Sequence, residues 1–202
     1  MYNCIFTAHC TESICDKSCP ILAETSYLLE RNKIDMNNPV FSDMSASVDI
    51  VSDFIRDNKG VCRITVPAGQ STVLMADLVT YCAICQNWQG SQLHCTVYNL
   101  RYSKYLDDTK ASWSSSSVPS DLEYVKIWSE SAKVLIISNI DYVNFGDFES
   151  QTLLNLIQSR ATGDKLTIFV APPLNMLVGK QSRFFEVFKQ LLSSSKEVVI
   201  RK

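Results

Sequence analysis

Four cysteines stand near the start of the chain at a spacing that suits a single metal centre. Cys4, Cys10, Cys15 and Cys19 all fall within the first 19 residues, and a proline follows Cys19. Zinc takes four thiolates tetrahedrally, usually from paired C-x2-C turns, which this segment lacks. A [4Fe–4S] cluster also takes four cysteines, and a final Cys-Pro is ferredoxin-like. Zinc, with His9 as an alternative to Cys10, and iron–sulfur both stay open, beside unliganded thiols.

The other cysteines favour a simpler interpretation. Cys82 and Cys85 lie in an apolar stretch that is typical of a helix packed on a sheet, and His94 and Cys95 follow further along. Cysteine behaves as a small apolar residue in such a position. We therefore expect core packing rather than a second metal site. With only two histidines, the chain supports no Ser-His-Asp or Cys-His catalytic set.

A second stretch whose residues could bind a ligand spans residues 64–72 and has the sequence ITVPAGQST. A strand, a glycine-containing turn and a helix present backbone N–H groups to a phosphate. Compared with the pattern GxxxxGK[ST], Gly69 and Ser71 are in place, with Thr72 next, but Gln70 replaces the lysine. Glutamine cannot neutralise phosphate oxygens. An ordinary strand–turn–helix corner remains an alternative for this segment.

The surrounding sequence predicts an α/β fold that positions this loop. Apolar segments at 61–66, 93–100, 133–138, 165–171 and 197–200 are typical of strands, and those at 71–85, 120–131, 148–160 and 182–192 of helices. The segment 133–138 is apolar on both faces, as a buried parallel strand is. Alternation at this spacing predicts a three-layer α/β domain with a parallel sheet.

The first third of the chain has a different organisation. Residues 21–32 and 46–58 each show the apolar period of a helix, with Val48, Val51, Phe54 and Ile55 on one face of the second. We therefore divide the chain into a cysteine-rich metal-binding segment at 1–20, a helical extension at 21–59 and the α/β domain at 60–202.

Residues 60–202 resemble the bacterial helicase-loader-like AAA+ family (DnaC/DnaI/IstB-like). The resemblance rests on the order of an apolar strand ending at Ser138-Asn139, a helix ending at Arg160, and a strand ending in Ala171-Pro172-Pro173. The closing FKQLLSSSKEVVI stretch is similar to the last helix and strand of the family. The resemblance implies a P-loop-type AAA+-like core. Some loaders also carry an N-terminal zinc module that contacts the helicase. The resemblance therefore favours zinc over iron–sulfur at the N-terminal cysteines.

The departures from the family all remove charge from the hydrolytic machinery. Ser138 and Asn139 replace the acid pair that binds magnesium and activates water, and Gln70 replaces the phosphate lysine. Ala171 replaces the polar sensor, and Gln190 stands where we place the arginine finger. Phosphoryl transfer depends on charges placed around the reacting group. We therefore expect no catalytic residues, and nucleotide that is absent or weakly bound.

Three smaller features remain. Asp141, two residues past the acid pair, is a candidate displaced ligand. Arg101, Tyr102, Lys104 and Tyr105 interleave cations and aromatics as single-stranded nucleic-acid sites do, although an exposed amphipathic turn is the favoured interpretation. Phe145 and Phe148 would form a partner-binding patch if exposed. Helical spacing places Phe184, Phe185, Phe188, Leu191 and Leu192 in the core.

Charge and hydropathy limit the remaining possibilities. Basic and acidic residues number 19 and 21, so no global field points to nucleic acid. No apolar run has membrane-spanning length and no secretory signal is present, so we expect a cytoplasmic protein without a membrane partner.

The resulting prediction is an ATPase-deficient accessory or adaptor of DNA replication or mobile-element maintenance. Its expected partners are a replicative helicase or another AAA+ protein, with single-stranded DNA as a further candidate. The alternatives are an atypical ATPase that uses Gly69, Ser71 and Asp141, and an iron–sulfur DNA-processing or redox protein.

Overall fold

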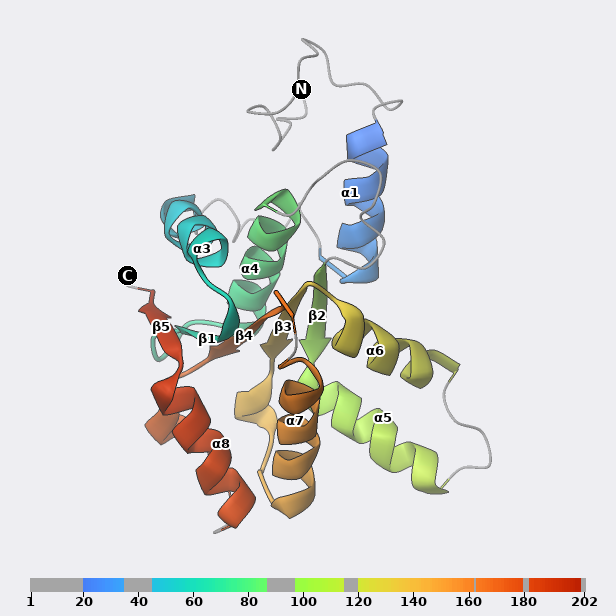
Figure 1. Ribbon diagram of the computed structural model, residues 1–202, viewed down its shortest axis with the longest axis vertical. Coiled ribbons are helices and arrows are strands. Elements are labelled where there is room, and N and C mark those ends of the chain that lie inside the picture. The colour runs from blue at the N-terminus through green and yellow to red at the C-terminus, as the bar shows by residue number, and fades with distance from the viewer. Residues whose placement is uncertain are drawn as a thin grey trace.

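Five short segments form one parallel β-sheet in the computed structural model of the chain (Figure 1). The structure describes residues 20–34, 45–86, 97–114, 120–161, 163–179 and 182–200. The strands are β1 (Gly60–Thr65), β2 (Val97–Arg101), β3 (Val134–Ser138), β4 (Leu166–Ala171) and β5 (Lys196–Val199). The predicted α/β class and parallel sheet are confirmed.

The strand order β2-β3-β4-β1-β5 brings distant segments to one edge of the sheet. All strand pairs are parallel, and β4 lies between β1 and β3, with Thr65 opposite Ala171. The carboxyl ends of β1, β3 and β4 therefore face the same way. Ligands of open α/β sheets bind outside these carboxyl ends.

Seven helices cover the two faces of the sheet in the described residues. They are α1 (Pro20–Arg31), α3 (Ser45–Asp57), α4 (Thr72–Gln86), α5 (Tyr102–Ser114), α6 (Ser120–Ser131), α7 (Asp147–Ser159) and α8 (Arg183–Ser194). Figure 1 shows α1, α3 and α4 on one side and α5 to α8 on the other. None of the described helices combines the length and the apolar character that a bilayer span requires.

Alternating strand residues build a separate core on each face. On one face α4 packs on the sheet and is covered in turn by α1 and α3, which contribute Leu28, Val51 and Ile55. Because α4 is enclosed in this way, it is apolar around most of its circumference. Cys82 is buried within this helix, as predicted, whereas the side chain of Cys85 lies outside the described part.

The opposite face is built around aromatic rings. Phe145 is fully buried and stacks on Phe185 at 5.3 Å between ring centroids. The condition of exposure on which a partner-binding patch depended is therefore not met at Phe145, because the loop after β3 folds back over this core. Phe148 is half-buried and packs edge-on against Trp113. Phe184, predicted in the core, is 36% exposed because it points away from the stripe formed by its neighbours on α8.

The helix α5 was not predicted. The segment after β2 is helical from Tyr102, and its burial of Tyr102 and Leu106 fixes it on the aromatic face. Tyr102 is fully buried and donates its hydroxyl proton to the carbonyl oxygen of Glu149, while Lys104 pairs with Asp108 at 2.7 Å. The buried Tyr102 is therefore unavailable to the stacking surface of cations and aromatics, and the segment is a helix rather than an exposed turn.

A buried arginine joins the ends of several elements. Arg160, directly after α7, is 3% exposed and donates to the hydroxyl of Thr167 at 2.9 Å. Its guanidinium also donates to the carbonyl oxygens of Ser129, Glu130, Ala132 and Leu166 at 2.8 to 3.3 Å. Burial without a carboxylate lowers the pKa of Arg160 to about 10. The cation therefore satisfies carbonyl groups at the end of α6 and the start of β4.

The end of α1 covers the outer edge of β2. Arg31 Nη2 donates to the carbonyl oxygen of Val97 at 2.7 Å, and the N–H of Asn99 donates to Asn32 Oδ1 at 2.7 Å. An unpaired strand edge is a template for unwanted pairing with another chain. These two side chains form hydrogen bonds with backbone groups at the outer edge of β2 and so hold the end of α1 against the sheet.

Replacing Gly179 by alanine is expected to destabilise the fold by about 1–3 kcal/mol. A Cβ atom at Gly179 would lie 2.5 Å from Cε1 of the buried ring of Phe185, which is itself held by Phe145. Urea denaturation measures the change. The exposed Asn175→Ala, a few residues earlier, is the matched control and should leave the midpoint unchanged. Equal midpoints for both variants would contradict the close packing.

Candidate functional site

The loop between β1 and α4 is a glycine-containing turn that leads into the start of a helix. Gly69 adopts φ 84°, which favours glycine, and the N–H of Gln70 closes a turn onto the carbonyl oxygen of Pro67 at 3.1 Å. The hydroxyl of Ser71 accepts from the N–H of Leu74 at 3.3 Å and so caps α4.

Three backbone donors at the start of α4 remain open. The N–H groups of Ser71, Thr72 and Val73 donate to no other group in the described part of the chain. A helix of 15 residues concentrates positive potential at this end, and free N–H groups there attract anions. The loop can therefore receive an anionic group through its backbone alone.

The side chain at the lysine position contributes no charge to this loop. Gln70 is half-buried, and its Oε1 atom is buried without a hydrogen-bond partner among the described residues. A buried unpaired acceptor costs free energy. The absence of a cation here distinguishes the loop from one built to neutralise β- and γ-phosphates.

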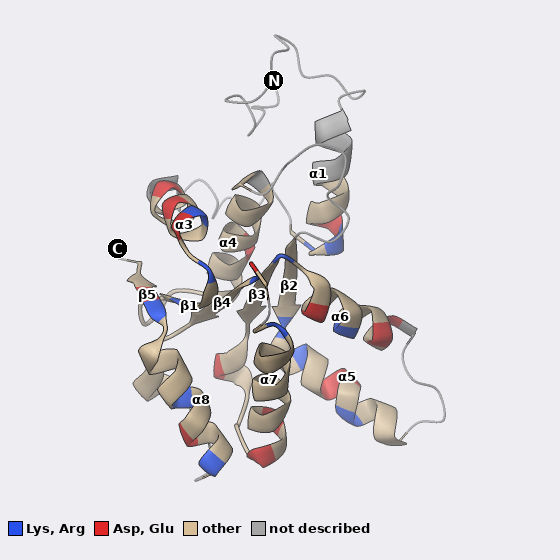
Figure 2. Ribbon diagram, in the orientation of Figure 1, with Lys and Arg blue, Asp and Glu red and all other residues tan. Residues whose placement is uncertain are grey.

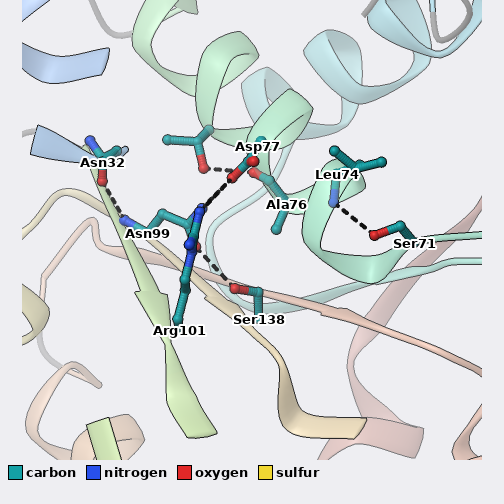
Figure 3. A network of polar contacts seen from close by, with 9 residues as sticks. Asn32, Ser71, Leu74, Ala76, Asp77, Asn99, Arg101 and Ser138 are labelled. Carbon is teal, nitrogen blue, oxygen red and sulfur yellow. Dashed lines mark hydrogen bonds and ion pairs between the residues drawn. The ribbon is translucent and has the colours of Figure 1, made fainter. Parts of the chain in front are cut away.

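The end of β3 lies at the same edge but turns its polar groups in different directions. Ser138 is fully buried, and its hydroxyl donates to Asn99 Oδ1 at 3.1 Å (Figure 3). Asn139 adopts the left-handed conformation with φ 60°, and its Oδ1 is buried without a partner among the described residues. Neither side chain offers a carboxylate to the loop.

Asp141 does reach the start of α4. It lies in the short helix η2 (Ile140–Tyr142), and the Thr72 hydroxyl lies 3.1 and 3.2 Å from its two carboxylate oxygens. Thr72 is buried and Asp141 is half-buried. The structure therefore brings together Thr72 and Asp141, two of the residues singled out in the sequence, through the turn that Asn139 makes.

Sequence reasoning missed a buried polar network beside this site. Asn99 Nδ2 donates to Asp77 Oδ1 at 3.2 Å, and Arg101 approaches the same carboxylate oxygen at 3.8 Å (Figure 3). Burial raises the pKa of Asp77 to about 6, against the opposing influence of Arg101 and Asn99. The sequence did carry a signal, because Asp77 is an isolated acid within the apolar run of α4.

The strand leading into the loop is anchored from β5. Glu197 accepts hydrogen bonds from the hydroxyl of Thr65 and from Arg63 Nη2, the latter at 2.7 Å. The hydrogen bond from Thr65, followed by the contribution of Arg63, lowers the pKa of Glu197. Thr65 is the last residue of β1, so this contact fixes the point where the loop begins.

The remaining family positions carry no charged group. Ala171 is buried at the end of β4, and its carbonyl oxygen accepts from the N–H of Val66 at 2.8 Å, so it helps to hold the loop through its backbone. Gln190 is exposed near the end of α8. Its role as the counterpart of an arginine finger stays a prediction.

The predicted metal ligands Cys4, Cys10, Cys15 and Cys19 lie outside the described residues, as do His9, His94 and Cys95. Within the described residues, no three His, Cys, Asp or Glu side chains gather as metal ligands would. The metal assignment therefore stays a prediction.

The parallel sheet order and the glycine-containing loop that leads from β1 into α4 belong to an α/β fold that is similar to the AAA+ domain of solved replication initiation proteins. Similar solved structures are domain III of the replication initiation protein DnaA from Thermotoga maritima and a replication initiator DnaA bound to AMPPCP and single-stranded DNA. The first has a TM-score of 0.55 at 12% identity, covering 87% of this chain and 67% of that one. The second has a TM-score of 0.54 at 8% identity, covering 88% and 50%.

A third similar structure is a DNA replication initiation factor, with a TM-score of 0.54 at 10% identity. The match covers 87% of this chain and 49% of that one, so the chain spans about half the length of this neighbour. Identities this low establish the fold alone. No family model and no curated protein sequence matches the chain.

Proposed function

We propose that this chain is an AAA+-like accessory or adaptor protein of DNA replication or mobile-element maintenance that does not hydrolyse ATP. It acts by binding a replicative helicase, another AAA+ subunit or DNA. The AAA+ fold supports the placement among replication-type proteins, and the chemistry of the loop supports the loss of hydrolysis.

The observation that carries the proposal is the direction of the Ser138 hydroxyl. At the end of β3, where a hydrolase places carboxylates toward the phosphate, this chain has a buried serine bonded to Asn99. Gln70, in the loop between β1 and α4 that faces the end of β3, supplies no cation. Hydrolysis depends on charges that stabilise the transferring phosphoryl group, and neither Gln70 nor Ser138 supplies one.

A protein partner is favoured over nucleic acid by the surface charge. Figure 2 shows lysines and arginines interspersed with aspartates and glutamates along the described helices. Several cations are engaged by carboxylates, as in the pairs Lys59–Asp164 and Lys110–Glu149. Non-specific DNA affinity requires unpaired cations along one face.

A second candidate, an atypical ATPase, is favoured by one specific observation. The contact between Thr72 and Asp141 places a hydroxyl and a carboxylate together at the start of α4. These oxygen ligands suit a magnesium ion, which would supply Lewis-acid stabilisation to a bound triphosphate. In this candidate Asp141 serves as the displaced acid and Gly69 and Ser71 form the loop.

A turnover assay separates the two candidates. We expect the purified full chain with magnesium and ATP to release phosphate no faster than its Asp141→Asn variant or a buffer blank. Asp147→Asn, an exposed acid on α7, is the matched control variant. Magnesium-dependent turnover that Asp147→Asn retains and Asp141→Asn loses would replace the adaptor with the atypical ATPase.

Metal analysis tests the N-terminal segment separately. We propose that Cys4, Cys10, Cys15 and Cys19 hold one zinc ion or one [4Fe–4S] cluster, since four thiolates satisfy either centre. Elemental analysis of anaerobically purified protein should find zinc or iron bound, and replacing the four cysteines by serine should remove it. Metal-free wild-type protein, or metal retained by the serine variant, would contradict the assignment.

A further inference from the structure

A pocket of about 490 Å³ lies at the outer edge of the sheet and is separate from the phosphate loop. Its walls come from the end of α1, from β2 and from the facing sides of α5 and α6, and none of residues 66–72 lines it. A volume of this size is within the range of pockets that take small organic ligands, about 300–1,000 Å³. The function proposed above does not use it.

One part of the pocket is apolar and aromatic. Tyr105 and Trp128 line it and are half-buried, with Leu122 and Val125 beside them. The ring of Trp128 is held in place by Tyr98 at 5.6 Å and by Tyr124 at 5.8 Å between centroids, and the guanidinium of Arg31 lies 5.4 Å from its centroid. Rings fixed in this way give a planar ligand a surface to pack on at little cost in conformational entropy.

The other part of the pocket carries charges of both signs. Lys33, Arg101 and Lys104 line it together with the acids Asp108 and Asp121. Lys104 pairs with Asp108 at 2.7 Å, but Arg101 stays 3.8 Å from Asp77, which is beyond hydrogen-bonding distance. The side chain of Arg101 is one-third exposed and lines the pocket, so its guanidinium can donate to an anionic group that enters the pocket.

From this combination we propose that the pocket is a second ligand site, which binds a nucleoside monophosphate. The ring packs on Tyr105 and Trp128, and the phosphate is held by Arg101 with Lys104. The Asp108 carboxylate accepts a hydroxyl of the sugar. A planar ring, a hydroxyl donor and an anion within one small molecule match the three kinds of lining group.

Ligand binding in this pocket changes the contacts of α4, the helix that begins at the loop after β1. Arg101 and Asn99 line the pocket, and the same two residues contact Asp77 on α4, while Asn99 also accepts from Ser138 (Figure 3). A phosphate that draws Arg101 away leaves Asp77 with less positive charge beside it. The ligand therefore weakens one of the contacts between β2 and α4, and the pocket acts as an effector site for the loop.

Calorimetric titration of the full chain with AMP, dTMP and inorganic phosphate tests the site. We expect saturable 1:1 binding of the nucleotides with a dissociation constant below about 1 mM, and inorganic phosphate at least tenfold weaker. Arg101→Ala and the exposed charge reversal Lys104→Glu should each weaken nucleotide binding at least tenfold. Lys59→Ala, in a remote pocket, should leave it unchanged.

Two variants separate this site from the phosphate loop. Thr72→Ala and Asp141→Asn should bind AMP like the wild type, because the loop lies outside the pocket. Loss of binding in these variants but not in Lys104→Glu would place the nucleotide in the loop and overturn the proposal. The proposal would also be overturned if no nucleotide bound saturably, or if inorganic phosphate bound as tightly as AMP. Free tryptophan supplies a planar ring without a phosphate, so tighter binding of tryptophan than of AMP would contradict the role given to the phosphate.

Discussion

Replacing Arg160 by methionine is expected to lower the free energy of unfolding by about 3 kcal/mol or more, the largest loss among the variants considered. Methionine retains much of the apolar stem but none of the donors. The buried carbonyl groups of Ser129, Ala132 and Leu166 would each lose a donor that lies at 2.8 to 2.9 Å. Each buried acceptor left unpaired costs about 1–3 kcal/mol.

Urea denaturation followed by circular dichroism measures this loss. Arg56→Met is the matched control, because Arg56 forms only exposed ion pairs with Asp53 and Asp57. Its denaturation midpoint should stay close to that of the wild type. Arg160→Lys should also be strongly destabilised, since an ammonium cannot reach all the carbonyls that the planar guanidinium bridges. A wild-type midpoint for either Arg160 variant would contradict the capping role.

Lowering the pH from 7 to 5 is expected to stabilise the wild-type fold relative to Asp77→Asn. Burial raises the pKa of Asp77 from 3.8 to about 6 in the folded protein, so the folded state binds this proton more tightly than the unfolded chain. The contribution is therefore fully present below the unfolded pKa and is lost as the pH rises through about 6. A difference of about 2 pKa units corresponds to about 3 kcal/mol across the full range.

The measurement is the free energy of unfolding of both proteins at several pH values between 4 and 7. Asp77→Asn keeps the size of the side chain and removes its titration, so the difference between the two curves isolates Asp77. Asp164→Asn, at a fully exposed pair with Lys59, is the control and should follow the wild type above pH 5. Parallel curves for wild type and Asp77→Asn would show that Asp77 ionises as freely as an exposed acid.

Most elements could be predicted from the sequence because their apolar periods are unambiguous. Residues 134–137 are all apolar, and with Ser138 they form the buried strand β3. The helix at 182–192 was recognisable from Phe185, Phe188 and Leu192, which recur with helical spacing and are all buried. Local periodicity determines such elements whatever their neighbours are.

The helix α5 and the strand order could not be obtained in the same way. In α5 only Tyr102 and Leu106 are buried, so its apolar stripe is too thin to stand out against the polar residues between them. Strand order depends on long-range pairing that the spacing of segments leaves open. The burial of Phe145 could not be predicted for the same reason, because the rings that cover it come from α8, which is distant in the sequence.

The candidate site was predictable in its backbone and less so in its partners. The strand, turn and helix around Gly69 indicated the loop, and Asp141 was recognised as a candidate ligand. The network through Asn99 and Asp77 was not, because each residue appears in isolation within an apolar segment. Only the pairing of β2 with β3 brings Asn99 next to Ser138.

The left-handed backbone at Asn139 limits which residues the end of β3 can carry. Asparagine accepts φ 60° with little strain, whereas glutamate at this position would cost about 1–2 kcal/mol. An aspartate at 138 would in addition have to ionise in a place where the present serine is fully enclosed. Acids at positions 138 and 139 would thus each be unfavourable in this backbone, so this turn is incompatible with a pair of ionised carboxylates at the end of β3.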